Sequence, residues 1–153
     1  MNKIESFKIN HLTLESGLYV SRRDRRGDCT VTTFDLRITA PNREPVIDMP
    51  ALHTIEHLCA TFLRNSSASE RIVYFGPMGC RTGFYLLTRN LDNQTVLKEL
   101  KLALKKTIEH PGEIFGSTRK ECGNYKCLSL EKAKEECKKY LDALNSKEHT
   151  FKY

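Results

Sequence analysis

The sequence predicts an α+β fold, a largely antiparallel β-sheet packed against helices, in a single domain of residues 1–153. Short segments with alternating apolar and polar residues indicate strands, and longer segments with apolar residues at helical spacing indicate helices. The two kinds of segment do not follow each other as the strand–helix–strand units of a parallel sheet. No internal repeat and no Gly/Ser/Pro-rich stretch divides the chain, and its 153 residues are enough for one core.

Residues 31–39 are the clearest strand, because side chains of opposite character alternate there with a period of two. Its apolar face has Phe34, Leu36 and Ile38, and its polar face has Thr33, Asp35 and Arg37. Residues 71–75 and 83–88 are two further strands joined by a glycine-rich loop, and weaker strands are expected near residues 6–10 and 17–20. Arginines between residues 22 and 26 are interrupted by Asp24 and followed by Gly27, which predicts a solvated hairpin tip.

Three helices are expected from apolar residues at helical spacing. The first begins after Pro50 and runs to about residue 65. The second follows Asp92 and Asn93, which are good N-cap residues, and ends before Pro111. The third begins near Ser129. These helices supply the layer that covers the predicted sheet.

Composition and charge exclude several classes of protein. Hydrophobic residues make up 39% of the chain and charged residues 29%, as in globular domains. No apolar run approaches the roughly 18 to 20 residues of a membrane span, and residues 1–10 do not form a secretory signal, so we expect a protein of the bacterial cytoplasm without a membrane partner. The net charge is +6, but no aromatic residues are interleaved with the arginine cluster, so no nucleic-acid partner is expected.

The first predicted helix contains the motif H-x-x-E-H, formed by His53, Glu56 and His57. Two histidines four residues apart lie on one face of a helix, so both rings can reach one metal ion. Glu56 points toward the same side and is not required as a ligand. Short motifs also occur by chance, and a helix with two ordinary histidines is the alternative. The motif favours a metal site with a carboxylate beside it.

Cys122 is the candidate third ligand, because Gly123 permits a tight backbone bend around an ion. Two histidines and one cysteine leave a tetrahedral position for substrate or water, as in catalytic sites. Cys127 leaves one alternative open, a closed structural site of two histidines and two cysteines. A second alternative is a metallopeptidase in which Glu56 activates a metal-bound water, although Cys80 would then have no role.

Cys80 lies in residues 75–83, where three glycines and a proline predict a sharply bent loop. A thiol held on such a loop near Arg81 would have a lowered pKa and would suit proton transfer. A buried structural thiol is the alternative. Cys59 and Cys137 fall on apolar helix faces and are expected in the core. In a cytoplasmic protein the six cysteines are expected as thiols rather than disulfides.

Five segments of the chain resemble the S-ribosylhomocysteine lyases, the autoinducer-2 synthases of bacteria. Three of them contain the residues discussed above: HTIEHLCATFLRN at 53–65, PMGCRTGFY at 77–85 and ECGNY at 121–125. Residues 6–11, and residues 34–37 with Pro41 and Asn42, match two more. The resemblance extends from about residue 3 to about residue 145, in the family's order.

The resemblance implies an enzyme that cleaves S-ribosylhomocysteine to homocysteine and 4,5-dihydroxy-2,3-pentanedione, the autoinducer-2 precursor. It implies one divalent metal per chain, natively Fe²⁺ with Zn²⁺ or Co²⁺ able to substitute, and a homodimer with active sites at the interface. Carried over by position, the metal ligands are His53, His57 and Cys122, the acid/base pair is Glu56 and Cys80, and the substrate contacts are Ser6, His11 and Arg37.

The chain departs from the family's usual pattern just before Cys80. Tyr74 stands where an acidic residue is usual, and Gly76 stands where a serine is usual. If those family side chains anchor the amino-acid end of the substrate, this chain must use other groups, and Arg37 is the candidate for the carboxylate. We therefore expect unchanged chemistry with weaker or differently anchored binding of the substrate.

Overall fold

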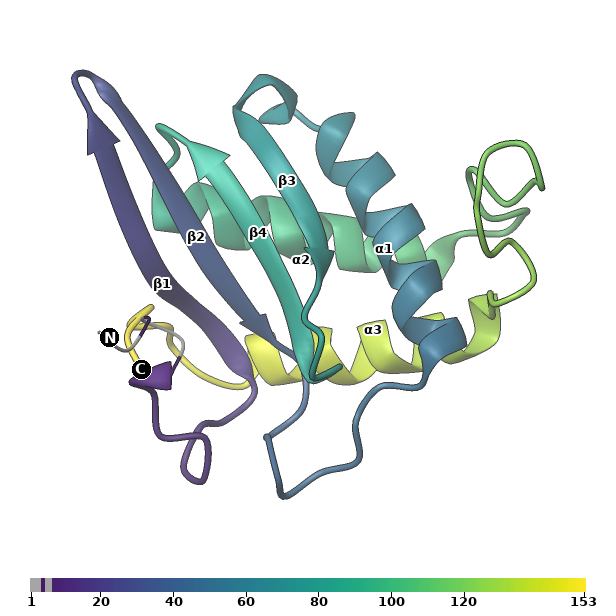
Figure 1. Ribbon diagram of the computed structural model, residues 1–153, viewed down its shortest axis with the longest axis horizontal. Coiled ribbons are helices and arrows are strands. Elements are labelled where there is room, and N and C mark those ends of the chain that lie inside the picture. Colours follow the sequence, from purple (N-terminus) through teal and green to yellow (C-terminus); the bar gives the residue numbers. More distant parts are fainter. Residues whose placement is uncertain (1–3, 5–6) are drawn as a thin grey trace.

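The computed structural model describes residue 4 and residues 7–153, and it confirms the α+β fold class (Figure 1). The sheet has the strand order β1-β2-β4-β3, and every neighbouring pair is antiparallel. Three helices pack against one face of it, and a short 3-10 helix precedes β3. The elements are β1 (Gly17–Arg26), β2 (Cys29–Arg37), α1 (Met49–Arg64), η2 (Ser69–Arg71), β3 (Ile72–Pro77), β4 (Gly83–Arg89), α2 (Asn93–Glu109) and α3 (Leu130–Asn145).

The two weakly predicted strands have different outcomes. β1 extends far beyond residue 20, because it pairs with the whole of β2 in a long hairpin. The strand expected near residues 6–10 is wrong for residues 7–10, which contain turns. The reason is local: Asn10 accepts a hydrogen bond from the Leu12 N–H through its side chain and one from the Thr13 N–H through its carbonyl, which forms a turn.

The β1–β2 hairpin ends in the predicted solvated tip. Arg22 forms an ion pair with Asp24 at 2.6 Å, and Arg25 donates to the carbonyl of Gly27. Gly27 has a φ of 56°, a conformation that glycine adopts at little cost. No helix in the described part of the chain is long and apolar enough to cross a membrane.

Each predicted helix begins at a capped residue. The side chains of Asp48, Asp92 and Ser129 accept hydrogen bonds from backbone N–H groups in the first turns of α1, α2 and α3, respectively. Helix α1 therefore begins at Met49, slightly earlier than expected. Pro50 lies inside its first turn, where its missing N–H leaves no hydrogen bond unmade.

The core lies between the helices and the sheet. It contains Phe34 and Leu36 of β2 and the predicted core thiols Cys59 and Cys137, all of them 0–1% exposed. Burial of this face of α1 leaves His53, Glu56 and His57 half-buried along its other side. The apolar pattern of α1 therefore places the H-x-x-E-H motif at the surface of a pocket.

The polar face of β2 is buried too. Asp35 is 1% exposed and Arg37 is 2% exposed, and Arg37 donates from Nε and Nη2 to the two carboxylate oxygens of Asp35 at 3.1 and 2.5 Å. Arg37 lies opposite Gly17 on β1 and Gly83 on β4, and neither neighbour has a side chain to crowd it. The alternation predicted the correct face for both residues, but that face holds a buried ion pair.

Candidate metal centre

The structure brings the three predicted ligands together. His53 and His57 come from α1, and Cys122 comes from the connection between α2 and α3, residues 110–129. The Nε2 atoms of the two histidines are 3.1 Å apart, and the Cys122 Sγ lies 3.4 Å from the His53 Nε2. The three ligand atoms all lie within 4.8 Å of one another.

Backbone carbonyls fix the orientation of both histidine rings. The Nδ1 of His53 lies 2.8 Å from the carbonyl oxygen of Cys127, and the Nδ1 of His57 lies 2.7 Å from that of Phe115. A carbonyl can only accept, so each Nδ1 carries the proton and each Nε2 presents a lone pair. Two lone pairs 3.1 Å apart repel each other unless a cation lies between them. The arrangement is therefore that of a cation site.

The donor set fits a tetrahedral divalent metal. Bonds of about 2.0–2.1 Å to nitrogen and about 2.3 Å to sulfur place two nitrogens about 3.3 Å apart and a nitrogen and a sulfur about 3.5 Å apart. The structure has 3.1 and 3.4 Å for the corresponding pairs. The Asn124 N–H donates to the Cys122 sulfur at 3.4 Å, which helps to hold the sulfur in place beside the two histidines.

In the described part of the chain, the closed structural site of two histidines and two cysteines is not formed. Among the described residues, the group that could hold an ion consists of His53, His57 and Cys122. Cys127 contributes its backbone carbonyl to His53 and not its thiol. Three protein donors are the arrangement of a catalytic metal site, in which a further position serves the substrate or water.

Glu56 shares a cavity of about 450 Å³ with the three ligands. One wall is formed by Phe115 and Gly116, and the ring of Phe115 packs edge-on against Phe62 of α1 with the centroids 5.6 Å apart. This packing holds the Phe115 carbonyl against His57. The sequence gives no signal for the contact between His57 and the Phe115 carbonyl, because every residue has a backbone carbonyl whatever its side chain.

Cys80 lies in a different pocket. With His11, Thr82 and residues of the 41–46 segment it lines a cavity of about 380 Å³, whose lining includes neither a metal ligand nor Glu56. Within one chain the structure therefore does not bring Cys80 and Glu56 to the same pocket. The third predicted substrate contact, Ser6, lies outside the described residues.

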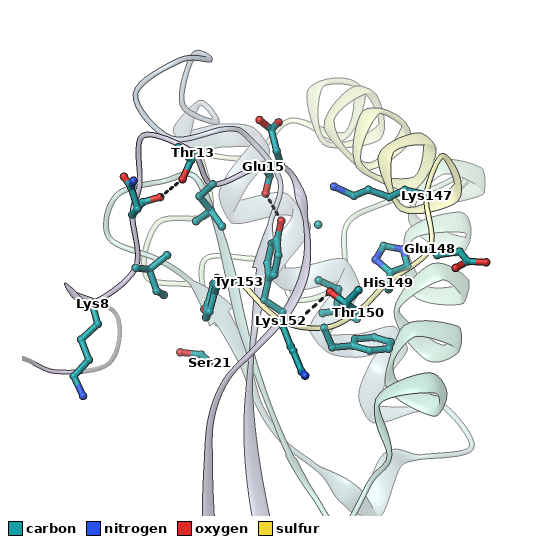
Figure 2. A pocket seen from close by; sticks show the side chains of 17 residues that line it. Lys8, Thr13, Glu15, Ser21, Lys147, Glu148, His149, Thr150, Lys152 and Tyr153 are labelled. Carbon is teal, nitrogen blue, oxygen red and sulfur yellow. Dashed lines mark hydrogen bonds between the residues drawn. The ribbon is translucent and has the colours of Figure 1, made fainter.

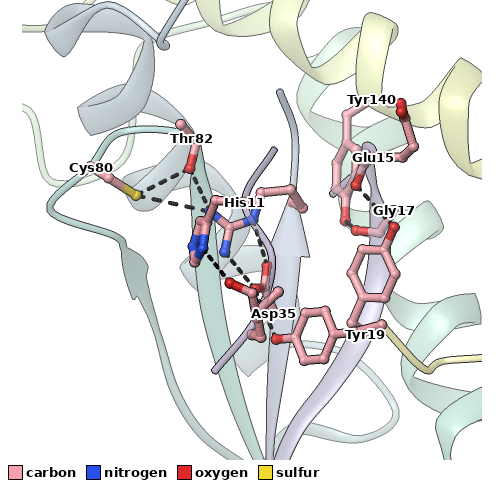
Figure 3. Close-up of polar contacts among 11 residues, drawn as sticks. His11, Glu15, Gly17, Tyr19, Asp35, Cys80, Thr82 and Tyr140 are labelled. Carbon is pink, nitrogen blue, oxygen red and sulfur yellow. Dashed lines mark hydrogen bonds and ion pairs between the residues drawn. The ribbon is translucent and has the colours of Figure 1, made fainter. Parts of the chain in front are cut away.

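The environment of Cys80 accounts for an activated thiol, although the cation responsible is not the predicted one. Partial burial raises the pKa of Cys80, but hydrogen bonds from the side chain and backbone of Thr82 and the charge of Arg37 outweigh it, so the pKa lies below its usual value. The Cys80 Sγ is 3.1 Å from the Thr82 Oγ1 and 3.9 Å from the Arg37 Nη1 (Figure 3). Arg81, the predicted cation, is not among the groups that lower this pKa. It has a φ of 58°, and its carbonyl accepts a hydrogen bond from the Ile47 N–H.

The partners of Arg37 are protein groups. Besides its two bonds to Asp35, its Nη1 donates to the Thr82 Oγ1 at 2.6 Å. A substrate carboxylate would have to compete with a buried carboxylate that is already bound through two oxygens. The contact of Arg37 with substrate stays a prediction, and its role as the substitute carboxylate anchor has no support from this geometry.

Tyr74 and Gly76 form a packed pair on β3. A Cβ added to Gly76 would lie 2.0 Å from the hydroxyl oxygen of Tyr74. The tyrosine side chain therefore occupies the space that a side chain at position 76 would need. The two departures from the family pattern are thus coupled by sterics.

A helix that presents two histidines and a carboxylate beside a cysteine thiol, with a second thiol of lowered pKa in a separate pocket, is the arrangement expected of a metal-dependent enzyme. Comparison with known proteins identifies the family. The family model described as S-ribosylhomocysteinase (LuxS) matches residues 4–151. The chain belongs to the S-ribosylhomocysteinase (LuxS) family.

Curated relatives match almost the whole chain. The S-ribosylhomocysteine lyase of Finegoldia magna is 53% identical over 147 residues, which are 95% of this chain and 94% of the relative. The S-ribosylhomocysteine lyase of Clostridium acetobutylicum is 47% identical over 148 residues, again 95% and 94%. That of Borrelia garinii subsp. bavariensis is 48% identical over 156 residues, 100% of this chain and 99% of the relative.

Proposed function

We propose that this chain is an S-ribosylhomocysteine lyase that releases homocysteine and 4,5-dihydroxy-2,3-pentanedione. The observation that carries the proposal is the pair of facing Nε2 atoms beside the Cys122 thiol, in a chain that matches the lyases over nearly its full length. The metallopeptidase alternative is not favoured, because it leaves the activated Cys80 without a role.

The reaction needs proton transfers at several carbon atoms of one sugar. A thioether is eliminated readily when it lies β to a carbonyl, because an adjacent carbon can then lose its proton. The carbonyl of the substrate begins at the wrong carbon, so it must be moved along the ribose by successive enolisations. A divalent ion at His53, His57 and Cys122, natively Fe²⁺ with Zn²⁺ or Co²⁺ as substitutes, would supply the Lewis acid that polarises the carbonyl oxygen.

Glu56 and Cys80 are the proposed acid/base pair. Glu56 lines the ligand cavity, where its carboxylate can take a proton from a substrate carbon and return it to the next one. The lowered pKa of Cys80 favours a thiolate, which can accept a proton. His11 shares the pocket of Cys80 and, with Ser6 and Arg37, is a proposed substrate contact. The thiols of Cys80 and Cys122 must stay reduced, which fits the cytoplasm.

A homodimer would unite the two pockets. Both acid/base groups must reach one substrate, yet Glu56 and Cys80 line separate pockets of the chain. A second copy that presents its Cys80 pocket to the metal pocket resolves this, and two-fold symmetry then gives two sites per dimer. Each pocket also has a large apolar side chain that is well exposed in the single chain, Phe115 at 40% and Val46 at 42%, as an interface requires.

Thiol release tests the activity. The metal-loaded protein is incubated with S-ribosylhomocysteine, and free thiol is followed with a chromogenic disulfide, together with the metal content of the sample. We expect steady release of homocysteine that stops when a chelator removes the metal. A protein with one metal per chain that releases no thiol would refute the proposal.

A mixed dimer tests the shared site. Glu56→Gln and Cys80→Ala chains are co-expressed with different tags, and the heterodimer is purified through both tags. If each site combines Glu56 of one chain with Cys80 of the other, the heterodimer has one intact site and about half of the parent activity. If each site lies within one chain, both sites of the heterodimer are damaged and it is as inactive as the two homodimers.

A further inference from the structure

Tyr153 reaches the buried ion pair behind Cys80. Its hydroxyl donates to the Asp35 Oδ2 at 2.9 Å, and its ring stacks on Tyr19 with the centroids 5.0 Å apart and the planes 11° from parallel. The segment that carries it is tied to β1 by the Val20 N–H, which donates to the carbonyl of Phe151 at 2.9 Å. Figure 2 shows Tyr153 in the wall of a pocket whose lining includes residues of β1 and none of the three candidate metal ligands. The proposed mechanism assigns it no step.

Among the described residues, the Tyr153 hydroxyl is one of three donors to the buried Asp35 carboxylate. Arg37 supplies the other two, and a buried charge is tolerated only when it is paired and its lone pairs are hydrogen-bonded. Two other tyrosines near Asp35 donate elsewhere: Tyr19 to the carbonyl of Glu15 at 2.9 Å, and Tyr140 to that of Gly17 at 2.8 Å (Figure 3). Of these three tyrosines, Tyr153 is the one whose hydroxyl donates to Asp35.

A chain of hydrogen bonds leads from Asp35 to Cys80. The two bonds to Asp35 fix the plane of the Arg37 guanidinium, so that its Nη1 is directed at the Thr82 Oγ1, 2.6 Å away. Thr82 accepts there, which leaves its own hydroxyl proton to donate to the Cys80 Sγ at 3.1 Å. The same Nη1 lies 3.9 Å from the sulfur, close enough for its charge to favour a thiolate.

We propose that Tyr153 is a positioning residue for Cys80, acting through Asp35 and Arg37. Its hydroxyl draws negative charge from Asp35 and holds the carboxylate in place, so Arg37 keeps both its orientation and more of its field at the Cys80 sulfur. Loss of the hydroxyl disfavours the thiolate through both effects. The inference rests on the proposed role of Cys80 as an acid/base group.

Other charges near Cys80 are unchanged by a substitution at position 153. The titratable and charged groups that face Cys80 come from β2, from β4 and from the wall of its pocket: Arg37, Tyr85, His11, Arg43 and Glu44. Among them, Arg37 is the group linked to Tyr153 through shared hydrogen bonds to Asp35. A change in the reactivity of Cys80 on loss of the Tyr153 hydroxyl would therefore be transmitted through Asp35 and Arg37.

Tyr153→Phe and Tyr19→Phe form a matched pair of variants. Each removes one hydroxyl from the same stacked pair of rings, but Tyr19 donates to a backbone carbonyl and not to Asp35. The metal-loaded proteins are treated with iodoacetamide at about pH 6, and alkylation of the Cys80 peptide is followed by mass spectrometry. We expect Tyr153→Phe to slow alkylation of Cys80 about three- to tenfold and Tyr19→Phe to leave it unchanged.

Turnover gives a second readout. Tyr153→Phe should move the acid limb of the kcat profile to higher pH with KM unchanged, which a purely structural role would not do. Equal alkylation rates in Tyr153→Phe and the parent, or equal slowing by both variants, would overturn the inference. Alkylation needs no substrate, so a parent without lyase activity would refute the proposed function, while slowing by Tyr153→Phe alone would still support the route to Cys80.

Discussion

The metal pocket and the Cys80 pocket are organised by different means. In the metal pocket the reactive side chains are oriented by backbone: the carbonyls of Cys127 and Phe115 hold the two histidine rings. In the Cys80 pocket the reactive thiol is oriented by side chains, through Thr82 and Arg37. Backbone carbonyls persist when a side chain changes, whereas a side-chain network is altered by any substitution within it. The metal pocket should therefore tolerate changes around its ligands better than the Cys80 pocket.

The largest effect is expected from Cys122→Ala in the metal pocket. The variant should lose both metal and activity, because two histidines remain from a three-donor site. Cys127→Ser is the matched control and should keep both, since position 127 contributes only its carbonyl. The measurement is the molar ratio of metal to protein with turnover. Loss of the ion from Cys127→Ser would mean that a closed site forms after all.

Glu56→Gln and Cys80→Ala should each keep the metal and the fold and lose turnover by about 10²- to 10⁴-fold, the usual contribution of a general acid or base. The measurement combines kcat, metal content and circular dichroism. Cys29→Ser is the control, because Cys29 begins β2 and lines neither of the two pockets. Turnover at the parent rate in either Glu56→Gln or Cys80→Ala would remove that residue from the mechanism.

Thr82→Val tests the side-chain organisation of the Cys80 pocket. Hydrogen bonds from Thr82 and the charge of Arg37 lower the pKa of Cys80, so the thiolate is present above that lowered pKa and is lost as the pH falls through it. Without the hydroxyl the pKa rises, and the acid limb of kcat/KM should move to higher pH, with a loss of about tenfold on that limb. Metal content should not change. An unmoved acid limb would show that Thr82 does not stabilise the thiolate.

The smallest effect is expected at Tyr74 and Gly76. If the acidic residue usual in the family makes a charged contact with the substrate, Tyr74→Asp combined with Gly76→Ser should lower KM by about tenfold and leave kcat nearly unchanged. Gly76→Ser alone should not lower KM, since the new side chain would clash with the Tyr74 hydroxyl. Steady-state kinetics of both variants decide the matter. A higher KM or a collapsed kcat in the double variant would show that this part of β3 is adapted to its present residues.

The metal pocket was the more predictable of the two from sequence. The spacing of His53 and His57 on a helix fixes their common face, and the capped start of α1 sets that helix in place. Cys122 could be chosen for its neighbouring glycine, but not distinguished from Cys127. That choice depends on the path of a connection without regular structure, where Cys127 turns its carbonyl to His53.

The environment of Cys80 was less predictable from sequence, because it depends on residues far apart in the chain. Alternation in β2 gave the correct faces, yet it could not show that Asp35 and Arg37 are buried, since burial of that face depends on distant parts of the chain such as Tyr153. For the same reason Arg81, adjacent in sequence, was expected to activate Cys80, while Arg37 from another strand does so. Contacts between residues far apart in sequence leave no local periodicity.

The connection between α2 and α3, residues 110–129, contains neither helix nor strand, although it supplies Cys122. An ion bound to Cys122 and to α1 would therefore act as a reversible cross-link between segments far apart in sequence, and because the site exists only in the folded chain, its binding free energy would add to folding stability. Free metal at a hundred times its dissociation constant adds about 2.7 kcal/mol to folding stability. Metal starvation would thus shorten the lifetime of the protein, with proteolysis beginning in this connection, as well as stop its turnover.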